Sequence, residues 1–212
     1  DTSAKFVNTS VTNEELRADD EAWAEPPPPT KSLLIQLISE QIPYFRDKPL
    51  FDGDGRGDTV AEYTARFLAQ EGAYGWSLDF QPALFCQLAY EGFLSTGLEI
   101  PVGPGPPLQI LLPWIDPKRN ALDFRDFHVS KQVRKHAGRY SMTTDAAFDD
   151  VILGCIRQHG EAWLYRGVRW LLRRLFASHA DDRGGLNVGV HTFELWDEAG
   201  QLVAGDLGYT VG

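Results

Sequence analysis

The sequence predicts an α+β fold, and three patterns in its C-terminal half carry that prediction. Apolar residues recur at helical spacing from Phe148 to Ile156, which is the pattern of one buried helix face. A second stripe of this kind runs through residues 164–176. Two strand-like runs, 189–196 and 202–210, follow and are joined by the turn-forming loop Asp197-Glu198-Ala199-Gly200. With a short strand at 139–143, the expected order is strand, helix, helix, strand, strand.

Side-chain chemistry assigns faces to these helices. Thr144 and Asp145 are good N-cap residues for the first helix, and Cys155 on its apolar face is expected to be a buried small hydrophobe. The core face of the second helix is predicted to hold Leu164, Val168, Leu171, Leu172 and Leu175, with Arg166, Arg169 and Arg173 on the opposite face.

His191 and Glu194 lie three residues apart on the next strand. Side chains alternate along a strand, so these two should point to opposite sides. We interpret both as structural rather than as an acid–base pair.

The N-terminal half is less regular. Residues 82–93 read as a helix that begins at Pro82, residues 108–114 as a strand, and residues 32–45 as either a short helix or a strand. Residues 52–58 resemble a calcium loop, but the twelfth position is Tyr63 where a glutamate is needed. We therefore expect a glycine loop there. Residues 1–31 are acidic and proline-rich and are expected to form a flexible leader.

Composition excludes several classes of protein. The 212 residues carry a formal net charge of −10, which argues against non-specific nucleic-acid coating. No apolar run approaches the length of a membrane span, which needs about 18 residues. Two cysteines, Cys86 and Cys155, permit neither a disulfide scaffold nor a four-cysteine zinc site. With no signal peptide at the start, we expect a cytoplasmic protein.

The charge is unevenly distributed. Residues 118–139 hold seven Lys or Arg residues and two Asp residues, so the acidic chain has a locally basic segment. Such a segment makes a tRNA partner compatible with the overall negative charge.

Several ordered blocks resemble the leucyl/phenylalanyl-tRNA–protein transferase family. Residues 116–119 resemble its Asp-Pro-Arg turn, 127–131 its Leu-His-Ile-Ser-Arg segment, and 148–155 its Phe-x-x-Val-Ile-x-x-Cys helix. Residues 161–164 resemble its Gly-Thr-Trp-Ile segment, and 191–196 its His-Ser-Ile-Glu-Val-Trp strand. Residues 201–209 look like the Leu-Val-Gly-Gly strand that follows, and 79–93 like the helix of the small N-terminal domain. At Leu94-Ser95-Thr96-Gly97 the chain departs from the family's aromatic turn.

The resemblance implies a small N-terminal α/β region followed by the first half of a GNAT-like mixed-sheet acyltransferase domain. The domains are then expected to be the leader at 1–31, an N-terminal domain at 32–138, and an incomplete acyltransferase domain at 139–212. The family's Gly-Glu-Ser-Met-Phe-Ser motif would follow Gly212, so we expect the native domain to continue, and the catalytic residues cannot be named.

The implied activity moves Leu or Phe from aminoacyl-tRNA to the N-terminal Lys or Arg of a protein, which marks that protein for degradation in the N-degron pathway. The ester is already activated, so no metal or cofactor is expected. The implied partners are aminoacyl-tRNA and the protein substrate, for an enzyme expected to be a monomer.

The resemblance also implies binding residues. Four candidates for the aminoacyl-adenosine site are Trp163, Trp114, Leu207 and Tyr209. Candidates for the tRNA acceptor stem are Lys131, Arg134, Lys135, His136 and Arg139. Four further arginines either extend that patch or pair with Asp181 and Asp182: Arg166, Arg169, Arg173 and Arg174.

Two other functions stay open at this point. One is an acyl-CoA-dependent GNAT N-acetyltransferase, and the other is a non-catalytic relative that binds tRNA or protein N-termini.

Overall fold

The computed structural model describes residues 12, 14–15, 18, 28–52, 59–67, 73–102, 107–118, 120–178 and 185–212. Most of the predicted leader, the glycine loop from 53 to 58, and the pair Asp181 and Asp182 lie outside the described residues.

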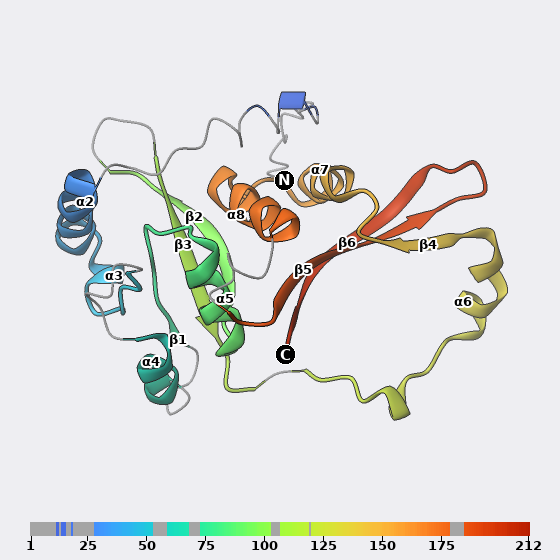
Figure 1. Cartoon of the computed structure of the whole chain (residues 1–212), viewed down its shortest axis with the longest axis horizontal. Helices are drawn as coiled ribbons and strands as arrows, with labels where there is room; N and C mark the ends of the chain where they lie inside the picture. The colour runs from blue at the N-terminus through green and yellow to red at the C-terminus, as the bar shows by residue number, and fades with distance from the viewer. Residues whose placement is uncertain are drawn as a thin grey trace, which may run out of the picture.

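A three-stranded antiparallel sheet organises the N-terminal part of the molecule (Figure 1). Its spatial order is β1–β3–β2, and its strands are β1 (Ala73–Tyr74), β2 (Leu94–Ile100) and β3 (Leu108–Ile115). The helices around it are α2 (Pro28–Gln41), α3 (Pro43–Arg46), α4 (Val60–Phe67) and α5 (Pro82–Tyr90). The predicted helix at 82–93 and strand at 108–114 are confirmed, and residues 32–45 prove to be helical. Proline suits the first turn of α2, α3 and α5 because the N–H it lacks would have no helical partner there.

The C-terminal part has the predicted order of elements. β4 (Ser141–Thr144), α7 (Phe148–His159), α8 (Arg166–Ala177), β5 (Val188–Trp196) and β6 (Leu202–Val211) follow one another. The three strands form a second antiparallel sheet of order β4–β5–β6. With both parts combining helices and antiparallel sheets, the α+β class is confirmed.

A basic linking segment, residues 116–140 between β3 and β4, joins the two parts. It contains the short helices η1 (Phe124–Asp126), α6 (Lys131–His136) and η2 (Ala137–Arg139). Figure 1 shows it running from the end of β3 along the lower edge of the view, up through α6 and back into β4.

The two parts share one hydrophobic core. Buried residues from α5 and β3, such as Leu88 and Leu111, belong to the same cluster as Ile152 of α7, Leu171 of α8 and Val190 of β5. This core crosses position 138, where the sequence suggested a domain boundary. The division into domains stays a prediction.

Two expectations about α7 and α8 are wrong. α7 begins after Ala147, and neither Thr144 nor Asp145 caps it. Arg169 is not on an exposed helix face, because only 2% of it is accessible. Its Nη1 donates to the carbonyl oxygen of Leu164 at 2.9 Å, and the core face of α8 is therefore wider than the leucine stripe alone.

Candidate functional site

Trp114 ends a ladder of three stacked aromatic rings on the N-terminal sheet. Its ring lies 5.8 Å from that of Tyr74 at an interplanar angle of 7°, and Tyr74 stacks in turn on Tyr44 at 4.8 Å and 16°. Tyr74 is buried in the middle, whereas Trp114 and Tyr44 are 40% and 55% exposed. The two outer rings are thus accessible to a flat ligand.

Tyr74 is buried among apolar side chains, and one cation lies against its ring. Burial raises the pKa of its phenol above the ordinary range, and a hydrogen bond with Tyr44 adds to that rise. The ammonium of Lys48 lies 4.6 Å from the centre of the Tyr74 ring. The phenol of Tyr74 therefore stays uncharged at neutral pH, and the Lys48 ammonium lies against its ring.

Trp163 lies in the turn before α8 and is anchored to the free edge of β2. Its carbonyl oxygen accepts hydrogen bonds from the Thr96 hydroxyl at 3.3 Å and the Gly97 amide at 3.5 Å. Its side chain is 36% exposed. The approach is close because Gly97 lacks a Cβ, which would lie 3.0 Å from both Tyr165 and Val168.

Tyr209 reaches from β6 to the start of β2. Its hydroxyl donates to the carbonyl oxygen of Phe93 at 3.0 Å, and its ring meets Phe85 of α5 edge-on at 5.7 Å. Leu207, two residues earlier on the same strand, is partly buried against the shared core. Both contacts of Tyr209 hold the C-terminal sheet against the N-terminal part.

Three of the predicted binding residues are tied to the backbone at or next to the start of β2, although Trp114 lies on the Tyr74 face of the sheet and Tyr209 packs with Phe85 in the other core cluster. Tyr209 binds Phe93, Trp114 is the register partner of Leu94, and Trp163 binds Thr96 and Gly97. Positions two residues apart on a strand are separated by about 7 Å. Sequence reasoning missed β2 by treating residues 94–97 as a changed turn. The alternation of Leu94, Thr96, Leu98 and Ile100 was the available signal for a strand.

The five predicted tRNA-binding residues lie on or just after α6. Ser130 caps this helix, since its hydroxyl accepts from the Val133 amide at 3.2 Å. All five side chains are exposed except His136, which is half-buried. Within the part of the chain that the structure describes, Lys131, Arg134, Lys135 and Arg139 make no ion pair. They form an accessible cationic surface.

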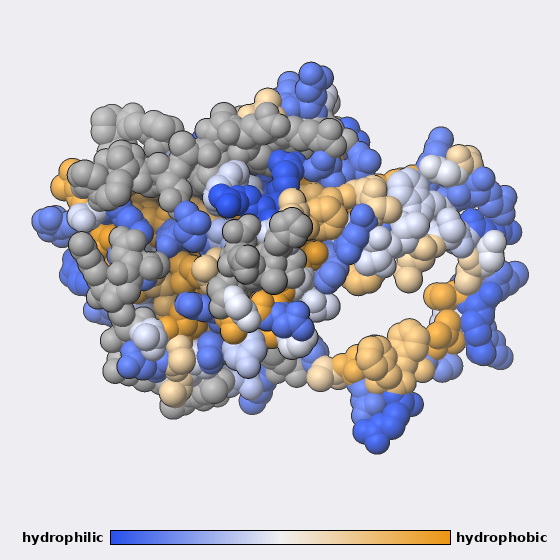
Figure 2. Space-filling model, viewed as in Figure 1, coloured by the Kyte–Doolittle hydropathy of each residue, from blue (hydrophilic) through white to orange (hydrophobic). Residues whose placement is uncertain are grey.

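The cationic surface on α6 is distant from the predicted aromatic binding residues near β2, Trp114, Trp163 and Tyr209. Figure 1 shows α6 at one end of the molecule and β2 and β3 toward the other. Figure 2 shows an open space between the linking segment and the sheet, with apolar side chains along the segment. Phe124, Phe127 and Leu122 are among its exposed hydrophobic residues. The structure therefore does not bring the two sets of predicted site residues together.

Among the arginines considered as an extension of the patch, two are engaged elsewhere. Arg169 is buried, with its Nη1 also 3.9 Å from Glu161. The Arg173 guanidinium binds the Asp149 carboxylate at 2.8 Å and so ties α8 to α7. Neither side chain contributes a free charge to a tRNA surface.

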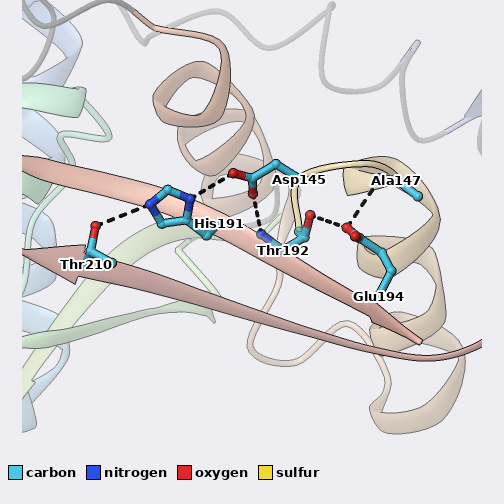
Figure 3. A network of polar contacts seen from close by, with 6 residues as sticks. All are labelled: Asp145, Ala147, His191, Thr192, Glu194 and Thr210. Atoms are coloured by element: carbon cyan, nitrogen blue, oxygen red, sulfur yellow. Dashed lines mark hydrogen bonds and ion pairs between the residues drawn. The ribbon is translucent and has the colours of Figure 1, made fainter. Parts of the chain in front are cut away.

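Glu194 has the structural role that the sequence suggested (Figure 3). Its carboxylate is buried, accepts hydrogen bonds of 2.6 Å from the hydroxyls of Thr143 and Thr192, and accepts from the Ala147 amide at 3.3 Å. Burial opposes ionisation, but these hydrogen bonds outweigh it and lower the pKa of Glu194. A strand residue thus supplies the acceptor for the start of α7 that Thr144 and Asp145 do not provide.

Comparison with known proteins gives the same picture as the ordered sequence blocks. Residues 121–212 match the family model described as leucyl/phenylalanyl-tRNA protein transferase. The C-terminal part of this chain resembles that family. Curated proteins named leucyl/phenylalanyl-tRNA–protein transferase from Salmonella newport (strain SL254), Salmonella typhimurium (strain LT2) and Salmonella typhi are each 33% identical over 113 residues.

The match covers 51% of this chain and 42% of each relative, so the chain spans less than half the length of the curated relatives it matches. No solved structure matches the chain. None of the described helices has the length and apolar character to cross a membrane. Within the described ranges, no three His, Cys, Asp or Glu side chains cluster as a metal site would require.

Proposed function

We propose that this chain is part of an aminoacyltransferase that moves Leu or Phe from aminoacyl-tRNA to the N-terminal Lys or Arg of a protein. The match of residues 121–212 to the transferase family is the observation that carries the proposal. In this function the enzyme acts in the cytoplasm as a monomer, and its products enter the N-degron pathway.

The reaction joins an amine to an ester that is already activated. The amine nitrogen attacks the carbonyl carbon, the bond from that carbon to the ribose oxygen breaks, and the proton that the nitrogen loses ends on the ribose oxygen as a hydroxyl. The binding task is to hold a terminal adenosine, an apolar side chain and a tRNA stem. Stacking of a base on an aromatic ring is worth about 1–3 kcal/mol, which suits the exposed rings of Trp114 and Trp163.

We assign the tRNA stem to the cationic surface on α6. All three cations of this surface, Lys131, Arg134 and Lys135, are exposed, and none forms an ion pair within the described residues. Phosphates can therefore bind them without displacing a carboxylate. Contacts of this kind are independent of sequence, and they weaken as the salt concentration rises, because the release of counterions from the phosphates then becomes less favourable.

Two measurements test the proposal separately. The first is binding of leucyl-tRNA to the 212-residue chain by filter retention at several salt concentrations. The triple change of Lys131, Arg134 and Lys135 to Ala should reduce both affinity and the salt slope, the slope by about three. Unchanged binding in this variant would exclude α6 as the tRNA surface.

The second measurement uses the full-length protein and follows the transfer of labelled leucine to a peptide with N-terminal Arg, with an N-terminal Gly peptide as the matched control. Label on the Arg peptide alone supports the proposal. A full-length protein that binds tRNA but transfers nothing is a non-catalytic relative, and one protected by acetyl-CoA but not by aminoacyl-tRNA is an acetyltransferase.

A further inference from the structure

Three side chains on the uncovered face of the C-terminal sheet form a continuous hydrogen-bonded chain (Figure 3). The Asp145 carboxylate lies 2.9 Å from Nδ1 of His191, and Nε2 of His191 lies 3.2 Å from the hydroxyl of Thr210. Asp145 comes from the turn between β4 and α7, His191 from β5 and Thr210 from β6. No part of the proposed transfer uses these residues.

The proton positions in this Asp145–His191–Thr210 hydrogen-bond network follow from the chemistry of the three side chains. Burial opposes ionisation of Asp145, but hydrogen bonds from His191 and the Thr192 amide outweigh it and lower its pKa, so at neutral pH this carboxylate only accepts. Nδ1 of a neutral His191 must then carry the hydrogen, and Nε2 must carry the lone pair. Nε2 therefore accepts from the hydroxyl of Thr210. A hydroxyl bonded to a base that a third group orients is the arrangement of an activated nucleophile.

The backbone is shaped to hold this arrangement. Asp145 has a φ of 61°, a left-handed conformation that costs most residues energy and that Asp tolerates better than most. Its second carboxylate oxygen accepts from the Thr192 amide at 2.9 Å, and its own amide donates to the Thr192 carbonyl at 2.9 Å. The carboxylate is thereby fixed relative to β5.

Gly189 leaves the space that the imidazole occupies. A Cβ at this position would lie 2.8 Å from Nε2 of His191 and 3.2 Å from the hydroxyl oxygen of Thr210. Gly189 is the register partner of Thr210, so any side chain here would enter the contact between base and hydroxyl.

Apolar side chains lie next to the Asp145–His191–Thr210 network on the same face of the sheet. Strand alternation places Phe193 on the side of His191, and the register places Thr144 opposite Phe193 and Met142 opposite Leu195. Phe193 is 44% exposed and Met142 is 70% exposed. An apolar acyl group held near Thr210 would find hydrophobic surface there.

We propose that Thr210, with His191 as its base and Asp145 as the residue that positions His191, is a nucleophile toward activated carboxylic esters with an apolar acyl group. The Thr210 oxygen attacks the ester carbonyl carbon while its proton passes to Nε2 of His191. The bond from the carbonyl carbon to the leaving oxygen then breaks, and His191 returns the proton to that oxygen. Water hydrolyses the resulting acyl-threonine with the same base. This esterase activity needs no tRNA and does not depend on the proposed transferase function.

The test uses the full 212-residue chain and the p-nitrophenyl ester of N-acetyl-leucine. We expect release of p-nitrophenol above the buffer rate, and an acyl group on Thr210 that peptide mass mapping locates and hydroxylamine removes. Thr210→Val should lower the release rate by about 100-fold, the lower range for loss of a positioned acid–base or nucleophilic group. Thr210→Ser should keep both the release and the label.

Ser141→Ala is the control, because Ser141 is an exposed hydroxyl residue of the same sheet that pairs with Trp196 and so lies on the face opposite His191; the rate of this variant should not change. Gly189→Ala should reduce the rate by displacing His191, with the far-ultraviolet circular dichroism of each variant checked against the unmodified chain. Release at the buffer rate, label that is absent from Thr210, or a rate that Thr210→Val leaves unchanged would overturn the proposal.

Discussion

The hydroxyl of Tyr209 donates a 3.0 Å hydrogen bond to the carbonyl oxygen of Phe93, 116 residues earlier in the chain. This contact joins β6 to the start of β2, and it is where the C-terminal sheet meets the strand that also anchors Trp163. A residue predicted to bind substrate is thus also a tie between the two sheets. Its contributions to folding and to binding need to be separated by experiment.

Tyr209→Phe should lower the free energy of unfolding by about 1 kcal/mol, because the ring contact with Phe85 stays while one hydrogen bond is lost. Urea denaturation measures the change. Tyr140→Phe is the matched control, since Tyr140 is exposed and should change stability by no more than about 0.5 kcal/mol. Equal effects of the two variants would refute a stabilising role for the Tyr209 hydroxyl.

The buried carboxylate of Glu194 should make stability depend on acid. Its pKa is lower in the folded chain than the ordinary value of 4.5, so its contribution is complete above about pH 4.5 and is lost as the pH falls through the folded pKa. Asp145, whose pKa is also lowered, adds to the same slope. Unfolding free energies between pH 7 and pH 3 measure it.

Glu194→Gln should be less stable at pH 7 by about 1–3 kcal/mol, because a neutral amide replaces a charged acceptor of several hydrogen bonds. The variant should also lose less stability than the unmodified chain between pH 5 and pH 3. A variant with an unchanged pH slope would show that protonation of Glu194 does not cause the loss of stability in acid.

Arg169 and the cationic surface on α6 should respond in opposite ways to substitution. Arg169→Ala removes a buried guanidinium that binds the Leu164 carbonyl and should lower stability by about 2–4 kcal/mol. Arg174→Ala, at an exposed position of the same helix, is its control. In binding assays on folded protein, Arg169→Ala should leave tRNA affinity unchanged, whereas the α6 triple variant should lose affinity and keep its melting temperature.

Gly97 should not accept a side chain. The Cβ of Gly97→Ala would lie 3.0 Å from Tyr165 and from Val168, so the turn that carries Trp163 must move away from β2. We expect a loss of about 1–3 kcal/mol and a shift in tryptophan fluorescence. Gly138→Ala is the control, because a Cβ there meets nothing within 4 Å. A variant at Gly97 as stable as the control would contradict the close packing.

Local sequence patterns were enough to predict the elements whose side chains repeat at a clear period. The leucine stripe of α8 is buried as predicted, from Leu164 to Leu175, and β5 and β6 are joined by the predicted loop. Helix α6 follows its cap at Ser130. In each case a local pattern was enough, because burial of one face or satisfaction of one helix end depends on residues close in sequence.

The contacts between distant residues could not be predicted in this way, because they depend on how the elements pack together. The start of α7 is served by Glu194, 47 residues from Ala147, which leaves Asp145 to bind His191. Arg169 is buried because its guanidinium finds the Leu164 carbonyl, so helical spacing alone placed it on the wrong face. The separate contacts of Trp114, Trp163 and Tyr209 with the start of β2 depend on strand pairing and packing across many residues. A local sequence pattern does not predict such contacts, because the position of each contacting residue is set by how the whole core packs.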